Sequence, residues 1–568
     1  MFAAIVRFRF VVIAATFALT CLFAMQLPDL QLDPDTEAYV PEGHPIRVYW
    51  SEAKDRFGIG REILVAVVTD TPNGIFTVAR LNAIARLDEA VKNVDGVFEA
   101  DVSSIANSDA MVGTEEGLEV EPLMEAPVET AAQAEAIRAK AYDNPVYLDR
   151  LISRDGSIAT IIVKTHHDVD VEETEIHRRI VAEAARHEVP GARILVAGSP
   201  AVEYVYGRQM TADLNRLIPL ALLVVVVTLF ACFPTISLRR LCLRSLPFAL
   251  LIGAYAWTHD FPGGWSGAAA ASVAGAMLTT RGALLPCIVV AVSVIWTWGL
   301  QALLGLPIYI AGTLVPPLLL AIGCADGIHV LERYYDVAAN GERSTNRRTQ
   351  IVIETMNELW RPVVLTSITT AIGFGSLMLG RMTVYRVFGF TTAFGILVAM
   401  LVSLTLLPAV LAMLPLPVPR RRGPTEDRLG KVLARWAEWI EGHRRTTVGI
   451  SLAIVTFFAY SSRALYVDYS WVESLAPGTD VLAADRVLRT RHGGTMPMNL
   501  IIRAPAADGM KDPVLLRGVD RVLTELATDP DVGDTRSIAE YVARMNQAMN
   551  EDRPEELRIP ETRELVAQ

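Results

Sequence analysis

An aspartate within an apolar stretch is the residue of this sequence best suited to chemistry. Asp326 lies in the run Leu318–His329, whose other residues are mostly apolar or small. An ionised aspartate at the centre of a membrane span costs about 2.5–3.5 kcal/mol on insertion scales, so such a residue usually has a function. His329 follows one turn later on the same helical face. We expect Asp326 to take up and release protons, with His329 as a second proton carrier. A helix cap or an interfacial charge is the alternative for Asp326.

Small and hydroxyl-bearing residues accompany this aspartate. Gly323 and Gly327 flank it and would let a neighbouring helix approach closely. The next apolar run holds hydroxyls that can bond either to a carboxylate or to carbonyls of their own helix: Thr366, Ser367, Thr369 and Thr370. We assign a supporting role in the proton pathway to Gly323, Gly327, Thr366, Thr369 and Thr370. Pro316 and Pro317 predict a broken or bent helix ahead of Asp326, a feature of transporter pathways.

Other chemistry is not indicated. The sequence has no phosphate-binding loop, no H-E-x-x-H and no G-x-S-x-G motif, so we predict neither ATP use nor a catalytic residue. One group of potential metal ligands fits no known spacing and is interpreted as a solvated loop: His166, His167, Asp168, Asp170 and His177. The five cysteines lie in or beside apolar runs, which argues against a disulfide framework. We therefore expect no enzyme, no cofactor and no metal site.

Long apolar runs identify a polytopic membrane protein. The chain has 568 residues, 52% of them hydrophobic, and a net charge of −11, which makes nucleic acid an unexpected partner. A membrane-spanning helix needs about 20 mostly apolar residues. The runs that meet this need are Phe10–Leu27, Leu217–Phe233, Leu284–Leu303, Pro307–His329, Pro362–Leu379, Val387–Leu414 and Thr446–Ser462. The first run has no small-x-small cleavage site, so we interpret it as a retained span and not as a signal peptide.

The polar segments between the runs define the expected domains. In chain order these are a first span at 1–27, an α/β domain at 28–215, a bundle of spans at 216–415, a cytoplasmic linker at 416–445, a span at 446–463 and a second, incomplete domain at 464–568. Within the bundle, residues 234–280 form either an inserted hairpin or a re-entrant pair. Within the linker, Glu426–Glu441 carries an apolar stripe beside basic residues and predicts an interfacial amphipathic helix.

The first polar domain has strand–helix–strand patterning. We predict strands at Glu62–Thr69, Ile158–Lys164 and Arg193–Ala197, and helices at Ala79–Lys92 and near Glu173–His187. Units of this size suggest small ferredoxin-like modules.

The chain also repeats itself. Val40–His44 after the first span is echoed by Ala476–Asp480 after the span at 446–463, and a predicted strand at Leu500–Ile502 falls at nearly the spacing of Ile63–Val65. A span followed by an α/β domain thus occurs twice, and we expect the second copy to be incomplete.

These motifs resemble those of the resistance–nodulation–division superfamily, and within it the MMPL-type predicted exporters. Patched and the sterol-sensing-domain proteins are more distant relatives. The segments that carry the resemblance are Ile322–His329, Leu365–Phe374, Trp298–Leu300, Leu304–Pro307 and Thr405–Ala409. The resemblance covers the chain from Met1 to Gln568, with Pro234–Thr280 as the clearest departure. It implies porter-like periplasmic domains and proton-driven export of lipids or other hydrophobic molecules at the bacterial inner membrane.

By position, Asp326 matches the family's proton-relay acid of the fourth span. Family members normally have two halves, and we expect this chain to contain one half and the start of another. The expected partners are the membrane, a lipid or hydrophobic small-molecule substrate, and either a second copy of the chain or a periplasmic protein.

Two other functions share the architecture. A non-transporting lipid or sterol sensor is the main alternative, but it has little need of an acid among apolar spans. A protein-export role resembling SecD and SecF would be expected to show the motifs of that pair, which we do not find.

The distribution of arginine predicts the topology. Arginines cluster in three of the segments that join the spans: Arg239, Arg240 and Arg244; Arg333, Arg343, Arg347 and Arg348; and Arg420, Arg421, Arg422, Arg444 and Arg445. Because cytoplasmic loops are enriched in arginine, Glu332–Arg361 and Arg420–Arg445 should be cytoplasmic and both polar domains periplasmic.

An impermeant thiol reagent applied from outside should label a Ser108→Cys variant that lacks other cysteines. Labelling from the cytoplasmic side only would contradict this topology.

Overall fold

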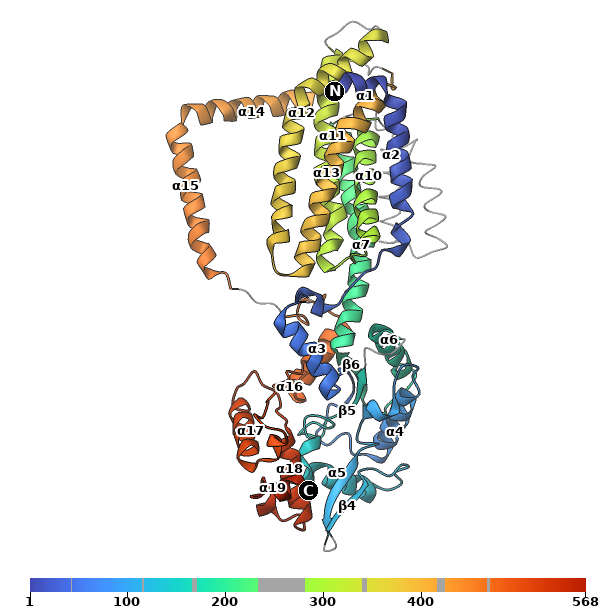
Figure 1. The fold of residues 1–568 in the computed structure, drawn as a ribbon, viewed down its shortest axis with the longest axis vertical. Coiled ribbons are helices and arrows are strands. Elements are labelled where there is room, and N and C mark those ends of the chain that lie inside the picture. The colour runs from blue at the N-terminus through green and yellow to red at the C-terminus, as the bar shows by residue number, and fades with distance from the viewer. Residues whose placement is uncertain are drawn as a thin grey trace. The chain divides into compact units, whose positions relative to one another are not determined.

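The chain divides into two compact units, each built from two separate stretches of sequence. A computed structural model describes residues 1–41, 43–114, 117–165, 171–232, 281–339, 345–415, 424–466 and 470–568 (Figure 1). The sheet unit comprises residues 48–208 and 469–568, and the helical unit comprises residues 1–47 and 209–468. The two units are described separately below.

The sheet unit is built on four antiparallel strands. Their spatial order is β2 (Val102–Ser103), β5 (Ile158–Thr165), β1 (Arg61–Val68) and β6 (Arg193–Gly198). In the central strand, Val65 lies opposite Ile161 of β5 and Val196 of β6. The three strands predicted from the sequence are confirmed as β1, β5 and β6.

Two helices connect these strands. In α4 (Val78–Lys92), the first turn is capped by Thr77, whose hydroxyl accepts a hydrogen bond from the Arg80 amide. The second helix, α6 (Glu173–Ala184), ends before the predicted His187. The chain therefore runs β1–α4–β2 and later β5–α6–β6, and both predicted helices are confirmed.

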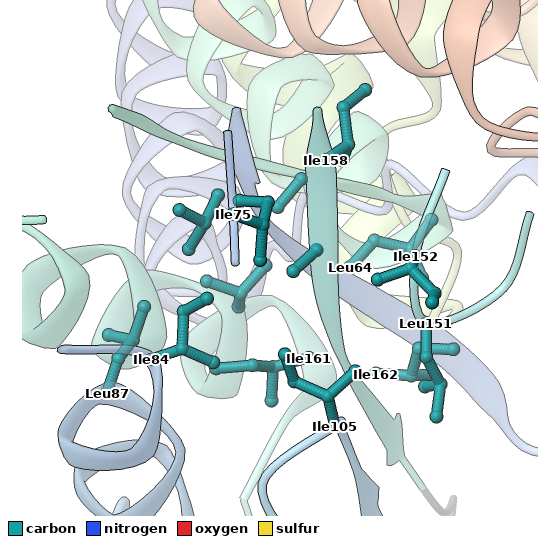
Figure 2. Close-up of a cluster of buried hydrophobic side chains, with 14 of the residues drawn as sticks. Leu64, Ile75, Ile84, Leu87, Ile105, Leu151, Ile152, Ile158, Ile161 and Ile162 are labelled. Atoms are coloured by element: carbon teal, nitrogen blue, oxygen red, sulfur yellow. The ribbon is translucent and has the colours of Figure 1, made fainter. Parts of the chain in front are cut away.

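The sheet is the centre of the main hydrophobic core. Figure 2 shows side chains of β1, α4 and β5 meeting there, including Leu64, Ile84 and Ile161. Every residue from Ile63 to Val68 is buried. Because successive side chains of a strand point to opposite faces, both faces of the sheet must be covered. This explains why β1 is continuously apolar in sequence and does not alternate.

The remaining elements of this unit lie outside the four strands. A hairpin of β3 (Asp109–Thr114) and β4 (Gly117–Pro122) is followed by α5 (Ala131–Asp143). The second stretch contributes α16 (Asp480–Arg491), α17 (Pro513–Leu526), α18 (Ile538–Met549) and α19 (Arg563–Ala567).

The strand predicted at Leu500–Ile502 is wrong. Within the described part of the second stretch, residues 470–568 form helices and loops but no strand. Leu500 is 63% exposed, so this apolar segment gains neither a neighbouring strand nor burial. Instead, Ala484 and Leu488 of α16 are buried in the same core as β1 and β5.

A buried arginine joins the second stretch to the hairpin. Arg544 of α18 is 2% exposed and donates a hydrogen bond to the Met111 carbonyl of β3 at 2.8 Å. Its guanidinium also pairs with Asp552 and, at 3.4 Å, with Asp143 at the end of α5. Several charge-assisted bonds therefore converge on one buried cation.

The helical unit contains the apolar helices. Its principal helices are α2 (Arg9–Ala24), α10 (Arg281–Leu303), α11 (Val315–Ala339), α12 (Thr345–Gly375), α13 (Thr383–Leu411), α14 (Pro424–Gly442) and α15 (Arg444–Ser461), preceded by the short α1 (Phe2–Arg7). The helix α7 (Ser199–Cys232) begins in residues of the sheet unit and continues into this one. Among the described residues, six segments are long and apolar enough to cross a membrane: Arg9–Asp29, Leu284–Leu303, Ile310–Ala338, Arg347–Leu379, Thr383–Leu411 and Arg444–Ala464. The chain is a polytopic helical membrane protein.

The first predicted span contacts α10 but remains largely exposed, with no buried residue in α2. Trp296 of α10 donates a hydrogen bond from Nε1 to the Thr20 hydroxyl of α2 at 2.9 Å. The rings of Trp296 and Phe23 lie 5.8 Å apart. The predicted run Leu217–Phe233 is helical as far as Cys232, within α7.

The proline pair does not break α11. Pro316 and Pro317 occupy its first turn, where the missing amide hydrogens have no helical partner to lose. The irregularity comes earlier, as a 3₁₀ segment at Ile310–Leu314. The predicted interruption therefore precedes the prolines.

The predicted amphipathic helix is confirmed as a helix, α14. Its exposed apolar side chains are Val432, Leu433, Trp436, Trp439 and Ile440. In the helix that follows, α15, no residue is buried. The predicted hairpin at 234–280, the candidate ligands at 166–170 and the arginines at 239–244 and 420–422 lie outside the described residues.

Replacement of Arg544 tests the link between the two stretches of the sheet unit. Arg544→Ala leaves the Asp552 carboxylate and the Met111 carbonyl without their buried partner, which should reduce stability by about 1–3 kcal/mol. Denaturant-dependent proteolysis of the full chain, with fragments identified by mass spectrometry, would measure the loss. Arg553→Ala, which removes an exposed pair with Glu551, is the control and should change nothing measurable. Equal effects of both substitutions would contradict the assignment.

Candidate functional site

The site centres on a carboxylate enclosed by helices. Asp326 of α11 is 6% exposed, and among the described residues of the helical unit it is the one buried acidic side chain. The hydroxyl of Ser367, on α12, donates a hydrogen bond to its Oδ2 atom at 3.1 Å. Ser367 is itself 2% exposed. The carboxylate thus links two neighbouring apolar helices from inside the bundle.

Two glycines let the other helices approach this carboxylate. A Cβ atom at Gly323 would lie 3.0 Å from Val290 of α10 and 3.4 Å from Ala399 of α13. At Gly327 it would lie 2.9 Å from Pro286 of α10. Any larger residue would therefore push α10 or α13 away. Gly323 and Gly327 place Asp326 where α10, α11, α12 and α13 converge.

A second contact aligns α11 with α12. Arg333 Nε lies 2.6 Å from Glu358 Oε2, about two turns beyond Asp326, and both side chains are partly exposed. An exposed pair of this kind adds little stability, but it is consistent with the register in which Ser367 faces Asp326.

This arrangement of groups can take up and release a proton. Burying an ionised carboxylate costs free energy unless hydrogen bonds compensate for the lost water, and among the described residues the hydroxyl of Ser367 bonds to Asp326. Protonation removes the charge and adds an O–H donor in place of an acceptor. The hydroxyl of Ser367 can serve either state because it both donates and accepts. One proton therefore changes the interaction between α11 and α12.

His329 is not enclosed with the carboxylate. Its side chain is exposed, although it lies near enough to interact electrostatically with Asp326. Asp326 lies at the edge of the buried face of α11, and His329, three residues later, falls just outside that face. The role predicted for His329 stays a prediction.

The three threonines bond to their own helix. Thr366 donates to the Pro362 carbonyl at 2.8 Å, Thr369 to the Leu365 carbonyl at 2.9 Å, and Thr370 to the Thr366 carbonyl at 2.7 Å. Thr366 and Thr369 are exposed and Thr370 is half-buried. The structure thus brings Ser367, and none of these three, to the carboxylate; their role in the pathway stays a prediction.

Helical periodicity contains the signal that selects Ser367. It lies four residues after Val363 and four before Ala371, and all three are buried on one face of α12. Hydroxyl content alone does not separate it from its neighbours. Buried polar residues on the two other helices of the site were not predicted either: Ser293, Thr297 and Gln301 of α10, and Thr391, Thr392 and Ser403 of α13.

The weaker metal hypothesis gains no support. His166, His167, Asp168 and Asp170 lie outside the described residues, and within the described part of the chain no three potential ligands gather. His177 of α6 is buried, and its ring lies 5.2 Å from that of Tyr204. Neither ring nitrogen has a hydrogen-bond partner among the described residues. Burial lowers the pKa of His177 from 6.5 to about 4.

Comparison with known proteins agrees with the motifs around Asp326. The sequence profile of the MMPL family matches residues 79–253 and 268–463. A Methanocaldococcus jannaschii protein described only as a membrane protein is 32% identical over 148 residues. That match covers 25% of this chain and 37% of the other protein. The family resemblance inferred from the motifs is confirmed.

His177 predicts a pH dependence of the sheet unit. The unfolded chain binds a proton at the usual pKa of 6.5 but the folded chain only near 4, so stability is full above pH 6.5 and falls as the pH drops toward 4. The loss should be about 3 kcal/mol, and His177→Phe should remove it. Denaturant-dependent hydrogen exchange of β5 and α6 in the full chain would measure it. The same pH dependence in both proteins would exclude His177 as the cause.

Proposed function

Since the chain belongs to the MMPL family, we propose that it is an RND-type exporter that uses the proton motive force to move lipids or other hydrophobic molecules out of the inner membrane. The observation that carries this proposal is the buried Asp326 carboxylate, hydrogen-bonded to Ser367 of the next helix. No enzymatic reaction is proposed.

The energy source sets what the site must do. One proton crossing 100 mV releases about 2.3 kcal/mol, and this energy does work only if protonation changes the conformation. The Ser367–Asp326 bond joins α11 to α12, so a change in the charge of Asp326 changes the free energy of that helix contact. In this proposal, the protonated and ionised carboxylates favour different arrangements of the two helices.

The other predicted residues take secondary roles in this proposal. The exposed His329, one turn beyond Asp326, exchanges protons with it as a second carrier. Gly323 and Gly327 keep the helices close together, so that a change in the charge of Asp326 alters the free energy of the contacts between them. Thr366, Thr369 and Thr370 support the pathway by shaping the surface of α12.

The sheet unit would handle the substrate. The order β2-β5-β1-β6, with β1–α4–β2 and β5–α6–β6 connections, supports a ferredoxin-like, porter-type module. We place this unit in the periplasm and α14 at the cytoplasmic face of the inner membrane. The exposed tryptophans of α14 suit that interface.

Substitution of Asp326 tests the proposal. Asp326→Asn keeps the size and hydrogen bonding of the side chain but cannot ionise, so gradient-driven efflux of Nile red from proteoliposomes should be abolished. Expression and dye binding should stay close to wild type. His329→Gln should reduce efflux only partly, since an exposed residue would assist proton delivery without being the obligatory carrier.

Asp336→Asn is the matched control. It makes the same change on the same helix, at an exposed position, and efflux should be unchanged. Undiminished gradient-driven efflux by Asp326→Asn would reject the relay assignment. Dye binding without any gradient-driven efflux by the wild-type protein would favour the lipid-sensor alternative.

A further inference from the structure

Two buried cysteines meet where α10 and α11 pack against each other. Cys287 of α10 is 9% exposed and Cys324 of α11 is 2% exposed, and both are free thiols. The two thiol groups lie near enough to interact with each other. Cys324 also packs in one buried cluster with Val290 and Val294, so its side chain faces α10. The function proposed above uses neither thiol.

Glycine contacts fix the register of the two helices around these thiols. A Cβ atom at Gly327 would lie 3.1 Å from the Cα atom of Pro286, so the backbones of α10 and α11 are in contact there. A Cβ atom at Gly323 would lie 3.0 Å from the side chain of Val290. A step of four residues forward on α10 therefore corresponds to a step of four residues backward on α11, and the two helices run antiparallel.

This register places the two thiols at nearly the same level. Cys287 follows Pro286 by one residue and Cys324 follows Gly323 by one residue, so both lie between the two glycine contacts. Their levels differ by two residues, which is about 3 Å along the helix axes. A disulfide joins residues whose Cα atoms are about 4.4–6.8 Å apart. Two residues at nearly one level on helices whose backbones touch are therefore candidates for this bond.

A single buried cysteine needs no explanation beyond its small apolar side chain. Two buried thiols that meet across a helix contact have a further property, because a covalent bond can join them with little movement of either helix. We propose that Cys287 and Cys324 form a redox modification site, a thiol pair that hydrogen peroxide converts to a disulfide between α10 and α11.

The reaction takes two steps and consumes one molecule of peroxide. The sulfur of Cys287, the more exposed of the two, attacks one peroxide oxygen and breaks the O–O bond, which gives a sulfenic acid and water. The sulfur of Cys324 then attacks the sulfenic sulfur, and the sulfenic oxygen leaves as a second water. Two thiols are oxidised to one disulfide, one peroxide is reduced, and the two thiol protons end in the two waters.

The bond would form beside the buried carboxylate. In the same register Cys287 is level with Asp326, and Cys324 precedes Asp326 by two residues on α11. A covalent link at this level holds α10 and α11 in one arrangement, so it opposes any movement of α11 that protonation of Asp326 drives. This consequence rests on the proton-driven function proposed above, whereas formation of the disulfide does not.

Cross-linking tests the site in the full chain. A protease site inserted after Gly305, between α10 and α11, allows the chain to be cut between the two cysteines. Since Cys324 is the one cysteine that follows this position, the two fragments stay joined only through a bond to Cys324. After peroxide treatment in membranes, they should run as one band without reductant and as two bands with dithiothreitol. Cys287→Ser should give two bands under both conditions.

Moving one thiol by a single residue provides the matched control. The double variant Cys324→Ala, Ala325→Cys keeps the number of thiols but places one at an exposed position of α11, so peroxide should leave two bands. Two bands from the parent protein at every peroxide concentration would overturn the site. Equal cross-linking of the relocated thiol would also overturn it, since a bond that forms at either position does not report the helix contact.

Dye efflux separates this site from the exporter. Proteoliposomes with peroxide-treated protein should lose gradient-driven Nile red efflux and regain it after dithiothreitol, while Cys287→Ser should keep efflux under peroxide. If the disulfide forms in a protein that shows no efflux in either redox state, the site stands and the exporter fails. If gradient-driven efflux is observed and no disulfide forms, the exporter stands and the site fails. A disulfide that leaves efflux unchanged would overturn the effect on α11.

Discussion

The burial of one carboxylate constrains the whole helical unit. Asp326 can sit inside an apolar bundle only if a donor meets it, and Ser367 of α12 supplies that donor. On the other sides of α11, Gly323 and Gly327 let α10 and α13 pack closely against its backbone, which encloses the carboxylate. Replacing either glycine would separate helices, and replacing the aspartate would leave a hydroxyl without its partner. Packing and charge in this region therefore cannot be changed independently.

Sequence patterns predicted the elements better than the contacts between them. Strands β1, β5 and β6, helices α4 and α6, and the apolar helices follow from periodicity and composition, which are local properties. The strand at Leu500–Ile502 failed because a strand needs a neighbouring strand, and local sequence cannot supply one. Asp326 was found because an acid in an apolar run is conspicuous. Ser367 was not singled out from the other three hydroxyls of its run. The four differ only in the face of the helix on which they lie, and the sequence does not say which face meets α11.

The two units solve the burial of polar groups in different ways. In the sheet unit, both terminal nitrogens of the Arg544 guanidinium have partners, which are the Met111 carbonyl, Asp552 and Asp143. In the helical unit, Ser293, Thr392 and Ser403 are as deeply buried but have no such partners among the described residues. A satisfied buried cation holds two stretches of chain in one arrangement.

Unpaired hydroxyls have the opposite consequence. A buried hydroxyl without a partner among the described residues does not tie its helix to a neighbouring one, so the two helices can shift relative to each other without breaking a side-chain hydrogen bond. A carboxylate whose protonation alters a helix contact needs such surroundings, since rigid pairing on every side would oppose the change. In the proposed exporter, the sparse hydrogen bonding around Asp326 suits a site that adopts two states, whereas the several bonds of Arg544 suit a contact that adopts only one.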